Sequence, residues 1–198
     1  MAVGGIGLIV GLGNPGPSYA DTRHNVGAWL VEAYCQRNRI QLKNDIKFNA
    51  RLGQFSVAGR DVKIMISNTF MNHSGRAVGS FAKYFQIPTE AILVAHDELD
   101  LPPGTARFKT DGGHGGHNGL KDIIHHLKGR EFHRLRIGIG HPGHKDEVVD
   151  YVLHRPSHED EKKIREAIEE TLKILPQIMM GDFEKAMNSL HSVKNEGN

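Results

Sequence analysis

The chain has 198 residues, which is enough for one hydrophobic core and too few for two domains of ordinary size. Its apolar share of 38% and charged share of 24% are typical of a soluble globular protein, and no apolar run is long enough to span a bilayer. The net charge of +2 does not by itself indicate a nucleic-acid-binding protein, and the single cysteine, Cys35, excludes an internal disulfide framework.

The first half of the chain alternates between strand and helix patterns. Short apolar runs bounded by glycine predict strands, and apolar residues repeated every three or four positions predict helices. We expect a strand over residues 6–11, a helix from residue 26, a hairpin over residues 54–57 and 62–66, a helix over residues 78–85 and a strand over residues 92–95.

The second half continues this alternation. We expect a short strand over residues 107–109, a helix over residues 120–127, a strand over residues 135–139, a long helix from residue 157 and a short helix after residue 182. Strands that alternate with helices, with one hairpin among them, predict a mixed sheet covered on both faces. The fold class is therefore α/β, a single three-layer α/β/α domain with a twisted mixed sheet.

The ends of the chain set the expected domain limits and location. We expect one domain over residues 1–191 and a disordered polar tail over residues 192–198. No positively charged leader precedes the first apolar run, and one cysteine suits a reducing compartment. The sequence therefore predicts a protein of the cytoplasm without a membrane segment.

The loop after the first predicted strand matches the dinucleotide-binding pattern G-x-G-x-x-G from Gly11 to Gly16. In that motif the third glycine lies within a helix, whereas here Pro15 and Pro17 flank Gly16 and the helical pattern begins further along the chain. We therefore interpret the glycines as shaping a loop that lets Asn14 and the backbone approach a ligand.

His24 is the strongest candidate for a chemical role. It precedes the first predicted helix, and Asp97 stands at the end of a predicted strand, where the ligand crevice of an open α/β sheet lies. A carboxylate bound to one imidazole nitrogen leaves the other nitrogen free to accept a proton near neutral pH. A lone histidine is more often structural, so the predicted meeting with Asp97 supports the chemical reading.

Three asparagines, Asn14, Asn72 and Asn118, are expected beside this histidine. An amide both donates and accepts hydrogen bonds, so the three describe a site that holds water and peptide groups without carrying charge. Asn72 is equally compatible with a helix cap. The glycine-rich loop over residues 112–119 precedes a helix, whose N–H groups favour an anion or developing negative charge.

Histidines on the loops over residues 112–119 and 141–144 raise a metal-dependent hydrolase as an alternative. No H-E-x-x-H or G-x-S-x-G motif is present, and histidines on glycine-rich loops lack the spacing of a zinc motif. Cys35 on an amphipathic helix is interpreted as a packed side chain rather than a nucleophile.

Basic residues concentrate in the middle of the chain. Residues 107–145 contain eight lysines and arginines, three acids and seven of the thirteen histidines. A solvated surface can have this composition, but so can a contact with phosphates.

Six motifs together resemble bacterial peptidyl-tRNA hydrolases over nearly the whole chain. They are Gly11-Leu-Gly-Asn-Pro-Gly16, Arg23-His24-Asn25, Asn68-Thr-Phe-Met-Asn72, His96-Asp97-Glu98, Gly115-Gly-His-Asn-Gly119 and Arg136-Ile-Gly-Ile-Gly-His-Pro142. The resemblance implies a monomer that hydrolyses peptidyl-tRNA without a metal or cofactor. A non-catalytic tRNA- or RNA-binding module is the alternative, although the basic stretch has no aromatic stacking platform.

The resemblance also implies roles for single residues. It assigns catalysis to His24 with Asp97 as its partner, and substrate handling to Asn14, Asn72 and Asn118. Tyr19, Phe70 and Met71 are similar in position to residues that line the cleft in the family. Lys109 and Arg136 are similar in position to basic residues that bind tRNA.

Overall fold

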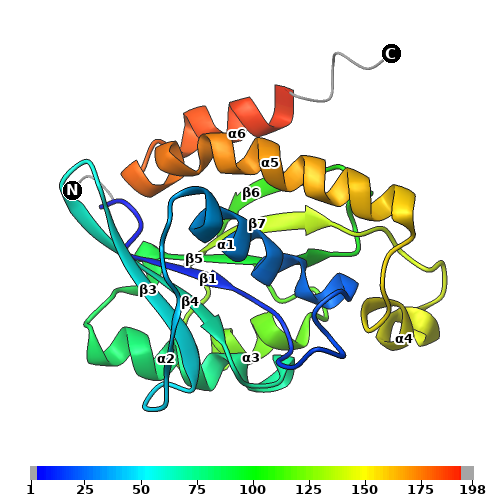
Figure 1. The fold of residues 1–198 in the computed structure, drawn as a ribbon, viewed down its shortest axis with the longest axis horizontal. Coiled ribbons are helices and arrows are strands. Elements are labelled where there is room, and N and C mark those ends of the chain that lie inside the picture. Colours follow the sequence, from blue (N-terminus) through cyan, green and yellow to red (C-terminus); the bar gives the residue numbers. More distant parts are fainter. Residues whose placement is uncertain (1–3, 193–198) are drawn as a thin grey trace.

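The computed structural model describes residues 4–192 as a seven-stranded sheet between two layers of helices (Figure 1). The strands are β1 (Leu8–Gly11), β2 (Lys43–Asp45), β3 (Ala50–Val57), β4 (Arg60–Ser67), β5 (Ile92–Glu98), β6 (Ala106–Thr110) and β7 (His133–Gly138). Their order across the sheet is β2-β3-β4-β1-β5-β7-β6. The central strands β4, β1, β5 and β7 run parallel, and the outer strands pair antiparallel.

Helices cover both faces of this sheet, which confirms the predicted α/β/α architecture. One layer contains α1 (Val26–Arg37), α5 (His158–Met180) and α6 (Phe183–Ser192), and the other contains α2 (Ser74–Tyr84) and α3 (Asn118–Leu127). The five-residue helix α4 (Val148–Val152) lies to one side of these layers. Among the described residues no helix is long and apolar enough to cross a membrane.

The first strand shows why the sequence forms this sheet. Leu8 and Val10 pack into the core beneath α2 and α3, while Ile9 packs into the core beneath α1 and α5. A strand that is apolar at every position is typical of a parallel sheet buried on both faces. Its C-terminal end at Gly11 therefore emerges between the two layers, at the edge where the polar residues gather.

A close contact fixes α1 against β5. A Cβ atom on Gly27 would lie 2.1 Å from the carbonyl oxygen of Ala95, so only glycine permits this approach. His24 lies three residues before Gly27, and Asp97 lies two residues after Ala95. The packing of helix on strand therefore delivers the predicted pair to one place.

The structure differs from the expected elements at several boundaries. The hairpin turn contains only Ala58 and Gly59, both with positive φ (48° and 76°), and its strands extend further than expected. The sequence pattern missed β2 and α4. Helix α6 continues through Ser192, one residue into the predicted tail, and residues 193–198 lie outside the described part of the chain.

Candidate active site

A cleft of about 1080 Å³ opens at the C-terminal ends of the central strands. Its walls come from the loop after β1, the segment before α2, the end of β5, the glycine-rich loop before α3, and α4. All of the residues selected from the sequence line it, namely Asn14, Tyr19, His24, Phe70, Met71, Asn72, Asp97, Lys109, Asn118 and Arg136. The structure thus brings together every position that was predicted for the site.

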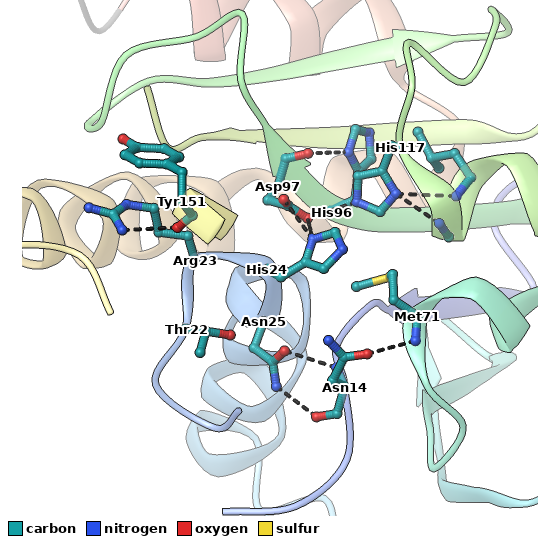
Figure 2. Close-up of polar contacts among 12 residues, drawn as sticks. Asn14, Thr22, Arg23, His24, Asn25, Met71, His96, Asp97, His117 and Tyr151 are labelled. Carbon is teal, nitrogen blue, oxygen red and sulfur yellow. Dashed lines mark hydrogen bonds and ion pairs between the residues drawn. The ribbon is translucent and has the colours of Figure 1, made fainter. Parts of the chain in front are cut away.

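His24 and Asp97 form a buried hydrogen-bonded pair (Figure 2). Nδ1 of His24 lies 2.8 Å from one carboxylate oxygen and 3.0 Å from the other. An ionised carboxylate only accepts, so Nδ1 carries the proton and donates it. In the neutral ring, Nε2 is therefore the unprotonated nitrogen that can accept a proton within the cleft.

Burial and charge act in opposite directions on this pair. Burial lowers the pKa of His24, but the negative charge of Asp97 and the hydrogen bond to it outweigh burial, so the pKa lies above 6.5. Burial raises the pKa of Asp97, but the charges of His24 and His117 and their hydrogen bonds hold it well below its usual range. Asp97 is therefore an anion throughout the neutral range.

His117 is a second partner of Asp97 that the sequence interpretation missed. Its Nε2 lies 2.7 Å from the carboxylate, and its Nδ1 accepts the backbone N–H groups of Gly119 and Leu120 at 3.1 and 3.3 Å. Because Nδ1 accepts, Nε2 must hold the proton and donate it to Asp97. The available signals were its place in the motif Gly115-Gly-His-Asn-Gly119 and its position immediately before the predicted helix.

This cap corrects the expectation for the glycine-rich loop. The first turn of α3 was expected to offer N–H groups to an anion, but the ring of His117 already accepts those of Gly119 and Leu120. The side chain of Asn118, the first residue of α3, is exposed and lines the cleft. The amide groups of the asparagines are therefore better placed to meet developing charge than this helix terminus.

His96 is buried beside the pair and is held neutral. Its Nδ1 lies 2.7 Å from the carbonyl oxygen of Asp97 and donates to it. Burial, assisted by the neighbouring His117, lowers the pKa of His96 to about 3. The ring therefore adds no positive charge to the site at neutral pH.

The arrangement also tests the metal-dependent alternative. Donor atoms of His24, Asp97 and His117 lie within 4.8 Å of one another, close enough in principle to hold a cation. A histidine ligand must present an unprotonated nitrogen to the metal. Nε2 of His117 is protonated as long as its Nδ1 accepts two N–H groups, so the three residues in this hydrogen-bonding state do not fit a metal centre.

The side chain of Asn14 has a fixed orientation (Figure 2). Its Oδ1 accepts the backbone N–H of Met71 at 2.7 Å, which leaves Nδ2 as the donor for a ligand. The backbone N–H and C=O of Asn14 bind the side chain of Asn25, each at 2.9 Å. Asn25, which lies next to His24, is therefore another residue that the sequence interpretation missed.

Asn72 and the aromatic residues lie around the opening of the cleft. Asn72 is exposed, and the N-cap of α2 is His73, so Asn72 is not the helix cap that was one of its two interpretations. Phe70, 53% exposed, meets the ring of Tyr19 edge to face at 6.0 Å. Together these side chains give the cleft an apolar rim with an amide beside it.

Cys35 is a buried, packed side chain, as predicted. Burial raises the pKa of its thiol to about 11, with a further contribution from the charge of Glu32. A thiol with such a pKa is a poor nucleophile at neutral pH.

Comparison with known proteins decides the family. Residues 8–197 match the profile of the family described as peptidyl-tRNA hydrolase. The peptidyl-tRNA hydrolase of Tolumonas auensis is 54% identical over 190 residues, 96% of each chain, and that of Vibrio cholerae is 50% identical over 192 residues, 96% of this chain and 98% of the relative. The crystal structure of the peptidyl-tRNA hydrolase from Acinetobacter baumannii aligns with a TM-score of 0.92 at 48% identity, covering 97% of this chain and 96% of that one.

The chain belongs to the peptidyl-tRNA hydrolase family. This confirms the family predicted from the six motifs, and it excludes the dinucleotide-binding reading. In the structure Gly16 lies in a loop with φ of 95°, well before α1 begins.

Lys109 and Arg136 are the two basic residues predicted to bind tRNA, and both line the cleft of this member of the peptidyl-tRNA hydrolase family. Lys109 is exposed on β6, where it pairs across the ladder with Arg134. Arg136 binds Glu98, with Nε 2.9 Å from the carboxylate. Arg134, which the sequence interpretation did not select, also lines the cleft, and its Nε and Nη1 are buried without a partner among the described residues.

Proposed function

We propose that the chain hydrolyses the ester that joins a peptide to the terminal ribose of tRNA. The observation that carries this proposal is the buried pair of His24 and Asp97, whose free imidazole nitrogen faces a cleft lined by three asparagines. Membership of the peptidyl-tRNA hydrolase family supports the same reaction.

His24 acts as the general base in this mechanism. Its Nε2 takes a proton from water while the water oxygen bonds to the ester carbonyl carbon, and the resulting imidazolium is stabilised by Asp97. The proton then passes to the ribose oxygen as the ester bond breaks. General-base assistance of this kind contributes about 10²–10⁴ in rate.

The amide of Asn72 stabilises the oxyanion that forms on the carbonyl. A donor aimed at developing charge strengthens its hydrogen bond in the transition state. Asn72 is exposed at the cleft, whereas the N–H groups at the start of α3 are occupied by His117. This distribution of donors supports the side chain of Asn72, rather than the loop N–H groups, as the group that stabilises the oxyanion.

Asn14 distinguishes peptidyl-tRNA from aminoacyl-tRNA. Its free Nδ2 is oriented to donate to a carbonyl oxygen of the first peptide bond, because Met71 holds its Oδ1. A substrate with a free ammonium in place of that amide leaves the donor without a partner and places a charge beside it.

Lys109 and Arg136 bind phosphates of the tRNA. Contacts with phosphate carry no sequence information, which suits an enzyme that accepts many tRNAs. Glu98 orients the guanidinium of Arg136 but also offsets its charge, so Lys109 supplies the larger share of the attraction.

The proposal also includes a mechanism without a metal or cofactor, a monomeric state, and action in the cytoplasm. The hydrogen-bonding state of His117 supports the first of these, because it leaves no unprotonated nitrogen towards Asp97. Analytical ultracentrifugation tests the second, and fractionation of cells tests the third.

The deciding experiment measures acyl release from N-acetyl-aminoacyl-tRNA in the presence and absence of a chelator, with unacetylated aminoacyl-tRNA as the control. We expect chelator-resistant cleavage of the acetylated substrate only. Loss of cleavage with chelator would support a metal-dependent hydrolase, and tight tRNA binding without cleavage would leave an RNA-binding module.

A further inference from the structure

Helix α4 forms an apolar wall of the cleft. Its residues and the one that follows it line the cavity through Val148, Val149, Val152 and Leu153. Val152 is buried in the core and Val148 and Leu153 pack against it, whereas Val149 is 68% exposed on the cleft side of the wall. A five-residue helix is not stable alone in water, so contacts with the rest of the chain must hold the wall in place.

Arg23 provides the most extensive polar contacts between this segment and the rest of the domain (Figure 2). Its Nη1 donates to the carbonyl oxygens of Tyr151 and His154 at 3.1 and 3.3 Å, and its backbone N–H donates to His154 at 3.1 Å. Its guanidinium also lies 3.9 Å from the centre of the Tyr151 ring. A cation at the C-terminal end of a helix is favourable because the last carbonyl groups carry partial negative charge.

Two further ties connect the same segment to the domain. The hydroxyl of Tyr151 donates to the carbonyl oxygen of Ile139, just after β7, at 2.6 Å. Arg155 forms ion pairs with Asp21 at 3.7 Å and with Glu161 at 3.2 Å, but its side chain is 63% exposed, and ion pairs of exposed side chains contribute little. Arg23 is therefore the main connection between the wall and the loop that carries His24.

We propose that Arg23 is a positioning residue that holds the α4 wall at a fixed distance from His24 and so sets the width of the substrate cleft. Arg23 is adjacent to His24 in sequence but does not line the cleft, so it acts through α4 rather than by touching substrate. The pair of His24 and Asp97 depends on separate contacts, those of α1 with β5 and of His117 with Asp97. Loss of Arg23 should therefore disturb substrate binding and leave the proton transfer intact.

Hydrogen exchange of the α4 amides tests, without any substrate, whether Arg23 holds α4 in place. In Arg23→Ala, loss of both side-chain hydrogen bonds should speed exchange in α4 about tenfold, while exchange in β5 stays unchanged. Arg155→Ala, which removes the ion pairs with Asp21 and Glu161 but no hydrogen bond to α4 itself, is the matched control and should change α4 exchange less than twofold. Equal exchange in wild type and Arg23→Ala would overturn the proposal.

Kinetics with N-acetyl-aminoacyl-tRNA test the second part, which rests on the proposed function. We expect Arg23→Ala to raise KM about tenfold, with kcat within about twofold and the acid limb of its pH profile unmoved. Arg23→Lys should restore part of the loss, since an ammonium keeps the charge but not the two-carbonyl contact and the stacking. A fall in kcat with unchanged KM, or a shifted pH profile, would overturn the role.

The two parts fail separately. If the wild-type protein does not cleave the substrate, the proposed function fails, and the exchange experiment still decides whether Arg23 holds α4. If the wild type cleaves and the Arg23→Ala and Arg23→Lys variants both keep the wild-type KM, the inference about Arg23 is wrong while the function stands.

Discussion

Oδ1 of Asp97 lies 2.7 Å from Nε2 of His117, and Oδ2 lies 2.8 Å from Nδ1 of His24, so one carboxylate accepts hydrogen bonds from two imidazole rings. The two rings differ in what they leave free. Both nitrogens of His117 are occupied, because its Nδ1 accepts the first N–H groups of α3, whereas His24 keeps Nε2 for the cleft. His117 therefore orients Asp97, and Asp97 orients His24.

Replacement of His117 should affect both stability and rate. His117→Ala removes a helix cap and one partner of the buried carboxylate, so we expect a loss of about 1–3 kcal/mol in the free energy of unfolding. We expect kcat to fall about tenfold. His117→Asn keeps a side-chain oxygen for the cap, so urea titration should show its stability partly restored while kcat stays low. Wild-type kcat in both variants would contradict the orienting role.

The charge of Asp97 sets the pH at which the enzyme becomes active. His24 works as a base only when it is neutral, and its pKa is raised, so kcat/KM should rise with pH through a point above 6.5. In Asp97→Asn the attraction is lost and burial remains, which lowers the pKa of His24. The acid limb of the pH–rate profile should then move to lower pH while the maximal rate falls about 10²-fold or more. An unmoved limb would contradict this account.

His96 should make the fold sensitive to mild acid. Its pKa in the native state is about 3 against 6.5 in the unfolded chain, so its contribution is present above pH 6.5 and is lost as pH falls. The slope of this loss is about 0.7 kcal/mol per pH unit at pH 6.5 and approaches about 1.4 kcal/mol per pH unit near pH 5. His133, whose pKa is also lowered, acts in the same direction, so the useful quantity is the difference between wild type and His96→Gln. Urea titrations at pH 6.5 and pH 5 should show that the free energy of unfolding changes less with pH in His96→Gln than in the wild type.

Asn14→Asp should weaken discrimination between substrates. The carboxylate has no donor for a peptide carbonyl, and it faces the N–H of Met71 while attracting a free ammonium. We expect kcat/KM for N-acetyl-aminoacyl-tRNA to fall at least tenfold while that for aminoacyl-tRNA stays level or rises. If the ratio of the two kcat/KM values matches wild type, Asn14 does not read the peptide bond.

Lys109 should account for part of the salt dependence of tRNA binding. In Lys109→Ala the slope of log K against log salt should become shallower by about one, as expected for the loss of one phosphate contact. Lys121→Ala removes an exposed lysine of the same basic stretch that does not line the cleft, and it serves as the control. Identical binding at low salt for Lys109→Ala and wild type would remove Lys109 from the tRNA contact.

The parts of the fold that follow a regular pattern were predictable from the sequence. The fully apolar run of β1 and the helical repeat of α1 reflect burial, and burial determines which residue types are tolerated at each position. The loop after β1 and the end of β5 were recognisable because polar residues follow a buried strand. This was enough to place His24 and Asp97 in one cleft.

The missed elements and residues depend on contacts made in three dimensions. β2 has exposed and partly exposed polar residues and pairs with β3 at the edge of the sheet, so it lacks an alternating pattern. α4 is too short for a periodic stripe, and contacts with Arg23 and with the core hold it in place. The role of His117 arises because its ring meets Asp97 from a distant strand, which no local spacing encodes.

The contact between Gly27 and Ala95 limits how this protein can be engineered for heat resistance. Replacing a helical glycine by alanine is a common way to stabilise a protein. The alanine lowers the conformational entropy of the unfolded chain, which raises the free energy of unfolding by about 0.5–1 kcal/mol. At Gly27 the added methyl group would collide with a carbonyl oxygen only two residues from Asp97, and the helix would have to move away. A thermostable variant should therefore keep this glycine and take its gains at exposed sites remote from the cleft.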